Sequence, residues 1–211
     1  MLSEEAFTKE AQKLGIDRTS TLIVYDNIGV YSSPRAWWMF RAMGHENIAI
    51  LDGGLPVWIN AGLSTEPKQV VHFKRGNFTA KAQPEFWKKS TDVLNSIANP
   101  QSLVLDARSK GRFNGTETEP RKGLRGGHIP NSINFHFDDV LDGHKMLPKD
   151  DLKQQFQKRG ISSQQLVFSC GSGLTACILA LAADLIGCEK TSVYDGSWSE
   201  WGLPGDLPID P

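Results

Sequence analysis

The sequence predicts an α/β protein of two domains, each built on a parallel sheet flanked by helices. The first observation is an internal repeat, in which residues 22–58 match residues 166–201 across a single one-residue gap. The second is that each copy alternates short apolar runs with helical stretches of about 10–15 residues, as parallel strands with right-handed crossovers do. The third is a glycine, Gly44 or Gly187, at the end of the helical stretch, where a helix C-cap glycine belongs.

Each predicted element rests on its local pattern. Short runs rich in aliphatic and aromatic residues indicate buried strands, and longer amphipathic stretches indicate helices. In the first copy we expect a helix at 6–14, a strand at 22–26, a helix at 33–43 and a strand at 48–51. In the second part we expect strands at 103–106, 133–135, 166–170 and 192–194, and helices at 91–98, 152–159 and 174–186.

The repeat also predicts the domain division. Residues 1–62 form the first domain, the polar and unpatterned stretch 63–76 is the linker, and residues 77–211 form the second domain. The second copy is preceded by residues 103–135, which have no counterpart before the first copy. We therefore expect the N-terminal domain to lack its first strands, which leaves a sheet edge and an apolar face uncovered.

Composition excludes several classes of protein. The net charge of −1 gives no electrostatic case for a nucleic-acid partner or an anionic membrane, and no apolar run approaches the roughly 20 residues of a membrane span. The acidic start (Glu4, Glu5) is unlike a signal or transit peptide. We expect a cytoplasmic protein, or a mitochondrial one if the source is eukaryotic.

Three cysteines lie close together in the second copy, at 170, 177 and 188. They form no Cys-x-x-Cys pair and the histidines are scattered, so we predict neither a zinc site nor a disulfide framework, and a reducing compartment. Cys177 lies within a predicted helix and Cys188 just beyond its end. We interpret both of these as structural.

Cys170 is the candidate nucleophile. It follows a predicted strand and opens the stretch Cys-Gly-Ser-Gly-Leu-Thr-Ala, in which Gly171 and Gly173 permit a tight curl of the backbone before a helix begins. Converging N–H groups and a helix N-terminus are expected to lower the thiol pKa from about 8.5 to about 3.5–7.5. The alternative is an inert core cysteine. The first copy has Asp26 here and lacks the paired glycines, which favours a function particular to Cys170.

A second candidate stretch, residues 109–121, follows the strand predicted at 103–106. It therefore lies at the carboxyl edge of the sheet, the edge that carries Cys170 and the one at which open α/β sheets bind ligands. Arg112 and Arg121 in this stretch are suited to holding a carboxylate bidentately. The alternative for each arginine is a solvated surface charge.

At these residues the sequence resembles the tandem-domain rhodanese family of sulfurtransferases. The loop Cys170–Ala176 is similar to the mercaptopyruvate-type loop, with leucine where valine is usual, and residues 111–121 are similar to the substrate-binding stretch. The resemblance implies two rhodanese-like domains, an inactive first one and a catalytic second one. It also implies that His128, in Gly-His-Ile-Pro, is a framework residue.

The resemblance implies a mechanism as well. The Cys170 thiolate takes the sulfur of 3-mercaptopyruvate as a persulfide, pyruvate leaves, and a thiol acceptor such as a reduced thioredoxin, or cyanide, removes the sulfur. No metal and no organic cofactor is implied. The residues that carry over as catalytic groups are Cys170, Ser172 and Thr175, and those that carry over as substrate-binding groups are Arg112, Arg121, Gly171, Gly173 and Leu174.

Other functions remain as alternatives. A thiosulfate sulfurtransferase is disfavoured because basic residues tend to follow the cysteine in that type, whereas Gly171 and Ser172 are uncharged. A persulfide-binding module without turnover is the non-enzymatic alternative. A cysteine phosphatase needs an arginine six residues after the cysteine, where this chain has Ala176, and a phosphate-loop NTPase needs a Gly-Lys-Ser/Thr sequence that this chain lacks.

Overall fold

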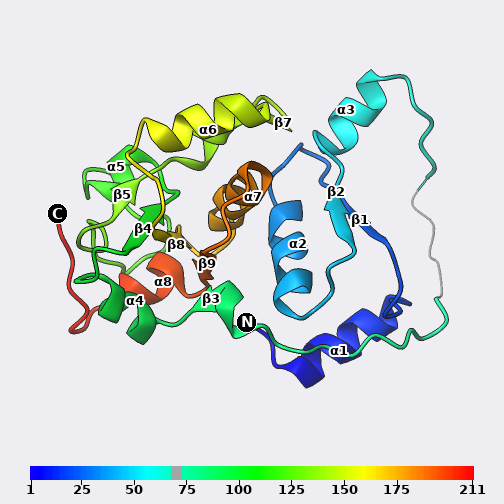
Figure 1. Cartoon of the computed structure of the whole chain (residues 1–211), viewed down its shortest axis with the longest axis horizontal. Coiled ribbons are helices and arrows are strands. Elements are labelled where there is room, and N and C mark those ends of the chain that lie inside the picture. The colour runs from blue at the N-terminus through cyan, green and yellow to red at the C-terminus, as the bar shows by residue number, and fades with distance from the viewer. Residues whose placement is uncertain (68–72) are drawn as a thin grey trace.

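A computed structural model describes residues 1–67 and 73–211, in which a smaller N-terminal half lies beside a larger C-terminal half (Figure 1). The first helix begins at a favourable N-cap, because the Ser3 hydroxyl accepts a hydrogen bond from the Ala6 N–H at 3.2 Å. The elements of the N-terminal half are α1 (Glu4–Lys13), β1 (Leu22–Val24), α2 (Ser33–Ala42), β2 (Ile48–Ile50) and α3 (Gly54–Asn60).

The C-terminal half alternates strands with helices along the chain. Its first elements are η1 (Pro84–Phe86), β3 (Trp87–Lys88), α4 (Ser90–Ser96), β4 (Ser102–Asp106), α5 (Lys110–Phe113), β5 (Ile133–Asn134) and η2 (Phe137–Val140). They are followed by β6 (Leu141–Asp142), β7 (Lys145–Met146), α6 (Lys149–Gln157), β8 (Gln165–Ser169), α7 (Ala176–Ile186), β9 (Thr191–Tyr194) and α8 (Ser197–Trp201).

The sheet of the C-terminal half has five strands in the order β3-β9-β8-β4-β5, and every neighbouring pair is parallel. In the register, Phe168 of β8 lies between Leu105 of β4 and Val193 of β9, and all three side chains are fully buried. The predicted α/β class with a parallel sheet is therefore confirmed. Since parallel strands share their direction, the loops after β4, β8 and β9 meet at one edge.

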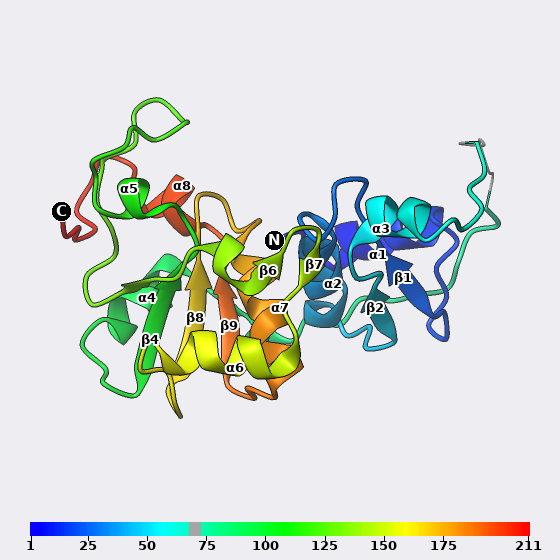
Figure 2. The same ribbon diagram turned by 90° about the horizontal axis from the view of Figure 1, so that it is seen from above.

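The buried helix α7 connects the two halves. It is apolar around most of its circumference, as a helix surrounded by protein must be. Figure 2 shows it between the C-terminal sheet and α2, where Trp37, Trp38 and Ala42 join its side chains in one core. Helix α7 ends at Gly187, whose φ of +88° is the left-handed C-cap that was predicted. In the described ranges, no helix is both long enough and apolar enough to cross a bilayer.

The N-terminal half carries a parallel sheet of two strands. Leu22 of β1 pairs with Ile48 of β2, and within the described residues β2 is the one strand paired with β1. Ile23 and Tyr25, in and just after β1, are more than half exposed. This small sheet therefore has an uncovered apolar side.

The segment that leads into the C-terminal half runs along the N-terminal half. The Phe78 N–H donates to the Ile16 carbonyl at 3.1 Å, and the Gln83 N–H donates to the Ala42 carbonyl at 2.8 Å. Phe78 also packs with Phe7 and Met43 in a separate apolar cluster. Residues 68–72 of the predicted linker lie outside the described residues, and the division at residues 62 and 76 stays a prediction.

Candidate active site

Cys170 lies immediately after β8, the central strand of the sheet, and before α7. Its side chain is only 2% exposed, yet it sits at the rim of the carboxyl edge, where the following loop residues Gly171 and Ser172 are half-buried. The Ser172 N–H points back at the Cys170 Sγ, with 3.4 Å between nitrogen and sulfur. The curl predicted from the glycines is therefore present, and it directs a backbone donor at the sulfur.

The second glycine of the loop meets a steric requirement. Gly173 has a φ of +77°, and a Cβ there would lie 2.8 Å from the Asp195 carbonyl oxygen. A residue with a side chain is therefore excluded both by conformation and by space. Beyond it, half-buried Leu174 and Thr175 form the approach to α7, with their carbonyls accepting from the N–H groups of Cys177 and Ile178.

The segment after β9 holds the Cys170 loop through hydrogen bonds. The Ser197 hydroxyl accepts a hydrogen bond from the Cys170 N–H at 3.1 Å. The Trp198 N–H donates to the Cys170 carbonyl and the Ser199 N–H to the Gly171 carbonyl, each at 2.9 Å. The start of α8 thus fixes both the nucleophile and the residue after it.

Both predicted substrate arginines converge on Gly171. A Cβ added to Gly171 would lie 2.7 Å from the Arg112 Nη2, so the guanidinium lies directly against the loop backbone. The Arg121 Nη1 donates to the Gly171 carbonyl at 3.3 Å. The structure therefore brings Arg112, Arg121 and Cys170 together at one edge, as was predicted from their places after two parallel strands, while their chemical roles stay predictions.

Arg112 is oriented by a carboxylate. Its Nε and Nη2 donate to the two oxygens of Glu119, at 3.2 and 2.7 Å. Burial alone would lower the pKa of Arg112, but hydrogen bonding to Glu119 and the negative charges of Glu119, Asp106 and Cys170 outweigh it and raise the pKa. The guanidinium is thus held as a cation against Gly171, the residue after the thiol.

Sequence analysis missed the residue that anchors this arrangement, Arg108. Its side chain is fully buried, it donates to both oxygens of Asp106 and to Glu119 at 2.8 Å, and its guanidinium lies 4.0 Å from the ring centroid of Trp198. It therefore links Glu119, the partner of Arg112, to the start of α8. The available signal in the sequence was an arginine two residues after the aspartate that ends a predicted strand.

A second missed residue comes from the N-terminal half. Arg35 of α2 donates to the Gly173 carbonyl at 3.2 Å and pairs with Asp195 at 2.5 Å. Asp195 follows β9, so Arg35 contacts two loops of the carboxyl edge at once. The sequence gives no local sign of this contact, because 138 residues separate Arg35 from Gly173.

The other cysteines have different surroundings. Cys177 is fully buried and its Sγ donates to the Gly173 carbonyl at 3.2 Å. Burial raises the pKa of the Cys177 thiol far above its ordinary value, and the nearby charge of Arg35 offsets only part of that effect. Cys188 is half-buried, and burial raises its pKa as well. Both thiols are therefore held in the neutral form, in line with the structural role predicted for them.

His128 lies beneath the substrate arginine loop. Its ring stacks on Phe113 of α5 with centroids 3.8 Å apart, and its Nδ1 lies 3.0 Å from the Phe113 carbonyl oxygen. Its backbone bridges to Asp210 near the C-terminus. These contacts are those of a framework residue that holds α5 in place.

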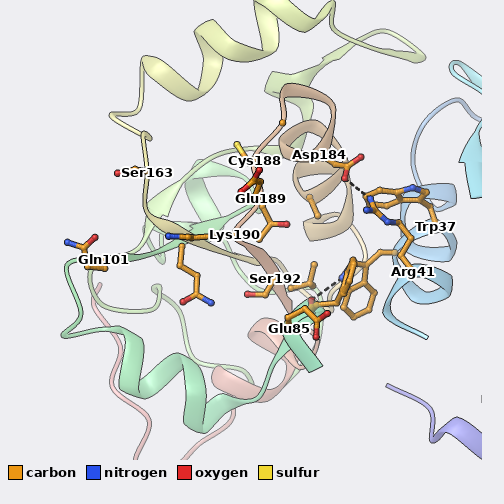
Figure 3. Close-up of a pocket in the computed structure, with 17 residues that line it drawn as sticks. Trp37, Arg41, Glu85, Gln101, Ser163, Asp184, Cys188, Glu189, Lys190 and Ser192 are labelled. Carbon is orange, nitrogen blue, oxygen red and sulfur yellow. Dashed lines mark hydrogen bonds and ion pairs between the residues drawn. The ribbon is translucent and has the colours of Figure 1, made fainter. Parts of the chain in front are cut away.

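A cavity of about 860 Å³ opens at the opposite, amino edge of the sheet. Figure 3 shows Cys188 and Lys190 on one side of it and Trp37 and Arg41 of α2 on the other, with Arg41 paired to Asp184 at 2.5 Å. Its lining does not include the Cys170 loop. It is therefore separate from the candidate site.

The fold and the site together define a class of protein: an α/β domain that presents a cysteine, in a loop of backbone donors flanked by arginines, at the carboxyl edge of a parallel sheet. The family model for the rhodanese-like domain matches residues 2–61 and 90–203. The chain belongs to the rhodanese family, in its tandem-domain group of 3-mercaptopyruvate and thiosulfate sulfurtransferases.

Individual relatives place the chain more closely. It is 41% identical to the 3-mercaptopyruvate sulfurtransferase of Homo sapiens, over 93% of this chain and 67% of that protein. It is 39% identical to the thiosulfate/3-mercaptopyruvate sulfurtransferase 1, mitochondrial, of Arabidopsis thaliana, over 99% of this chain and 61% of that protein. The crystal structure of SseA from Escherichia coli, a 3-mercaptopyruvate sulfotransferase, superposes with a TM-score of 0.84 at 36% identity, over 95% of this chain and 75% of that one. The chain thus spans three fifths to three quarters of these relatives.

Proposed function

We propose that the chain is a sulfurtransferase in which Cys170 carries sulfur as a persulfide. The observation that supports this most directly is the position of the thiol, at the end of β8 with the Ser172 N–H directed at its sulfur. A backbone donor at that point stabilises negative charge on the thiolate before transfer and on the persulfide after it. The charge of Arg112 against Gly171 adds to this stabilisation.

The proposed donor is 3-mercaptopyruvate. Arg112 and Arg121 hold its carboxylate and ketone, because both guanidinium groups lie beside Gly171 and present planar, bidentate donors. The Cys170 thiolate attacks the donor sulfur, an S–S bond forms, and the C–S bond breaks with its electron pair passing to carbon. The resulting enolate takes up the proton given up by the donor thiol and leaves as pyruvate, and Ser172 and Thr175 are the proposed proton-handling groups.

The second half-reaction restores the enzyme. A thiol acceptor, such as a reduced thioredoxin, attacks the outer sulfur of the persulfide, and the Cys170 thiolate is the leaving group. Cyanide would accept the sulfur in the same way, as thiocyanate. This ping-pong cycle requires no metal and no organic cofactor.

Thiosulfate is the alternative donor, and the residues that directly follow Cys170 make it the less favoured one. A dianion is best bound by cations placed directly after the cysteine, where Gly171 and Ser172 offer backbone and hydroxyl groups only. The arginines that are present suit one planar carboxylate. A persulfide-binding module without turnover is the remaining alternative, since the loop would stabilise a persulfide whichever reaction formed it.

The test is release of pyruvate and sulfide from 3-mercaptopyruvate with dithiothreitol, beside thiocyanate formation from thiosulfate and cyanide. Both assays are run on this chain and on Cys170→Ser, with folding checked by circular dichroism. Turnover of mercaptopyruvate that disappears in the variant supports the proposal. Faster turnover of thiosulfate would contradict the choice of donor. A folded chain that binds persulfide at Cys170 without turnover on either donor would favour the binding module.

A further inference from the structure

We propose that Ser197 is a positioning residue for Cys170: a left-handed backbone at Ser197 aims its hydroxyl at the N–H of the nucleophile and fixes the thiol in the loop. The inference rests on the proposed use of Cys170 as the nucleophile. Ser197 itself does not reach the reacting atoms, because its hydroxyl is engaged with the backbone of Cys170 and Tyr194.

The first support is an unusual backbone conformation. Ser197 has a φ of +48°, and within the described residues it shares a positive φ among non-glycine residues only with Asn131. Asparagine tolerates this region because its side chain bonds locally, whereas serine is rarely found there. A strained residue that persists beside a candidate active site points to a functional requirement at that position.

The second support comes from the repeat. Gly54 occupies the equivalent position in the first copy and has a similar φ of +57°. The next N–H bonds in the same way in both copies: Leu55 to the Asp26 carbonyl at 2.8 Å, and Trp198 to the Cys170 carbonyl at 2.9 Å. The fold therefore accepts glycine at this turn without strain. The copy with the cysteine carries serine instead, and serine adds a hydroxyl.

The third support is what the hydroxyl does. Strand β8 ends at Ser169 and β9 at Tyr194, so the Cys170 N–H lies beyond the paired strands. The Ser197 Oγ accepts from this N–H at 3.1 Å and donates to the Tyr194 carbonyl at 2.8 Å. Ser197 and Cys170 are both almost fully buried, so water does not readily replace the hydroxyl. The Ser197 side chain thus connects the chain after β8 to the end of β9, one hydrogen-bonded step beyond the paired strands. In this way it sets the backbone direction at Cys170.

Two substitutions separate positioning from simple stabilisation. Ser197→Gly removes the hydroxyl and relieves the backbone strain, and Ser197→Ala removes the hydroxyl and keeps the strain. If Ser197 positions Cys170, both variants slow Cys170 alkylation by iodoacetamide about tenfold, the effect of one lost hydrogen bond to a buried donor. Their melting temperatures then diverge, with Ser197→Ala the lower. Turnover of 3-mercaptopyruvate falls in kcat by a similar factor in both variants, and KM changes little.

The matched control is Ser192→Ala. Ser192 is also a buried serine. It lies in β9, and its hydroxyl donates to the Leu166 carbonyl of β8 at 3.4 Å, near the amino ends of the two strands. This variant is expected to alkylate at the wild-type rate. Alkylation at wild-type rate in Ser197→Gly would overturn the proposal, as would loss of folding in that variant, because the hydroxyl would then serve the fold alone.

The alkylation rate keeps this inference separate from the proposed function. It measures the exposure and reactivity of Cys170 without any sulfur donor. Slow alkylation in both Ser197 variants, with a wild-type chain that turns over neither donor, would sustain the positioning role and reject the proposed reaction. If the wild type turns over 3-mercaptopyruvate and Ser197→Gly is alkylated at the wild-type rate, the proposed reaction is supported and the positioning role of Ser197 is rejected.

Discussion

Asp26 and Cys170 occupy equivalent positions in the two copies of the repeat, and the backbone donors around them are used differently. In the first copy, the N–H groups of Tyr31, Ser32 and Ser33 donate to the Asp26 carboxylate at 3.0, 3.0 and 2.7 Å. The anion that these donors bind is therefore a side chain of the protein itself, the Asp26 carboxylate. In the second copy the Ser172 N–H is directed at the Cys170 sulfur. The anion that this donor can stabilise is therefore the thiolate or persulfide of Cys170.

The Asp26 site predicts a pH-dependent contribution to stability. Burial raises the pKa of Asp26, but hydrogen bonds from Ser32, Ser33 and Tyr31 together outweigh it and hold the pKa below its ordinary value. A carboxyl with a lowered folded pKa stabilises the protein above its unfolded pKa of about 4, and this stability is lost as pH falls through the folded pKa. Asp26→Asn is therefore expected to lower the free energy of unfolding at pH 7 by about 1–3 kcal/mol.

Chemical denaturation of both proteins between pH 7 and pH 3 checks this expectation. The difference between wild type and Asp26→Asn must be largest above pH 5 and must shrink as the pH falls below about 4, since the Asp26 carboxyl takes up a proton more readily in the unfolded state than in the folded one. Asp17→Asn is a suitable comparison, because Asp17 bonds to the Asn77 N–H at the exposed surface of the same half. A difference that stays constant with pH would mean that the charge of Asp26 contributes nothing.

The three cysteines are expected to separate clearly in function. Cys170→Ser should reduce turnover by roughly a thousandfold or more, as loss of a covalent nucleophile does. Cys188→Ser and Cys177→Ser should retain turnover within a few-fold, because burial raises the pKa of both thiols. Peptide mapping after iodoacetamide treatment of the native protein at pH 7 should find label on Cys170 and not on Cys177. Label on Cys177 would contradict its assignment as a structural thiol.

Substrate binding is expected to depend on Arg112 more than on its neighbours. Arg112→Lys keeps the charge but loses the fork that bonds to Glu119 and faces Gly171, so KM for 3-mercaptopyruvate should rise about 10- to 100-fold. Lys122→Ala, at an exposed position of the same loop, is the control and should leave KM unchanged. Steady-state kinetics of both variants decide this. An unchanged KM in Arg112→Lys would remove this arginine from the binding site.

Elements with a long, repeated pattern were predictable from the sequence, and short ones were not. The helices expected at 33–43 and 174–186 are α2 and α7, because two copies of one pattern and a terminal glycine support each. The two-residue strand β3 and the five-residue helix α8 carry no periodicity of their own. Strand β3 forms by pairing with the free edge of β9, and α8 is held by the packing of Trp198 over Arg108.

The candidate site divides in the same way. The convergence of Arg112, Arg121 and Cys170 followed from the rule that parallel strands end at one edge. The supporting residues Arg35 and Ser197 were not predictable, since each acts on the Cys170 loop from a distant part of the chain. A contact of this kind depends on how α2 and α8 pack, and the local sequence of neither element encodes it.

Two arginines of α2 offer a matched test of what the N-terminal half contributes to the site. Arg35 and Arg41 each lie 4.9 Å from the ring centroid of a tryptophan, and each pairs at 2.5 Å with an aspartate of the C-terminal half. The difference that matters for the site is that Arg35 also donates to the Gly173 carbonyl in the Cys170 loop. Replacing either residue by methionine removes one ion pair between the halves, worth about 1 kcal/mol of stability.

Activity should distinguish the two variants where stability does not. Arg35→Met is expected to lower kcat about tenfold, because the Gly173 carbonyl keeps only the weak Cys177 thiol as a donor and the loop that carries Cys170 is less well fixed. Arg41→Met should keep the wild-type kcat, since its partner Asp184 faces the cavity at the opposite edge of the sheet. The measurements are kcat and KM for 3-mercaptopyruvate together with urea unfolding of both variants. Equal losses of activity would mean that the N-terminal half supports α7 in general and has no specific contact with the catalytic loop.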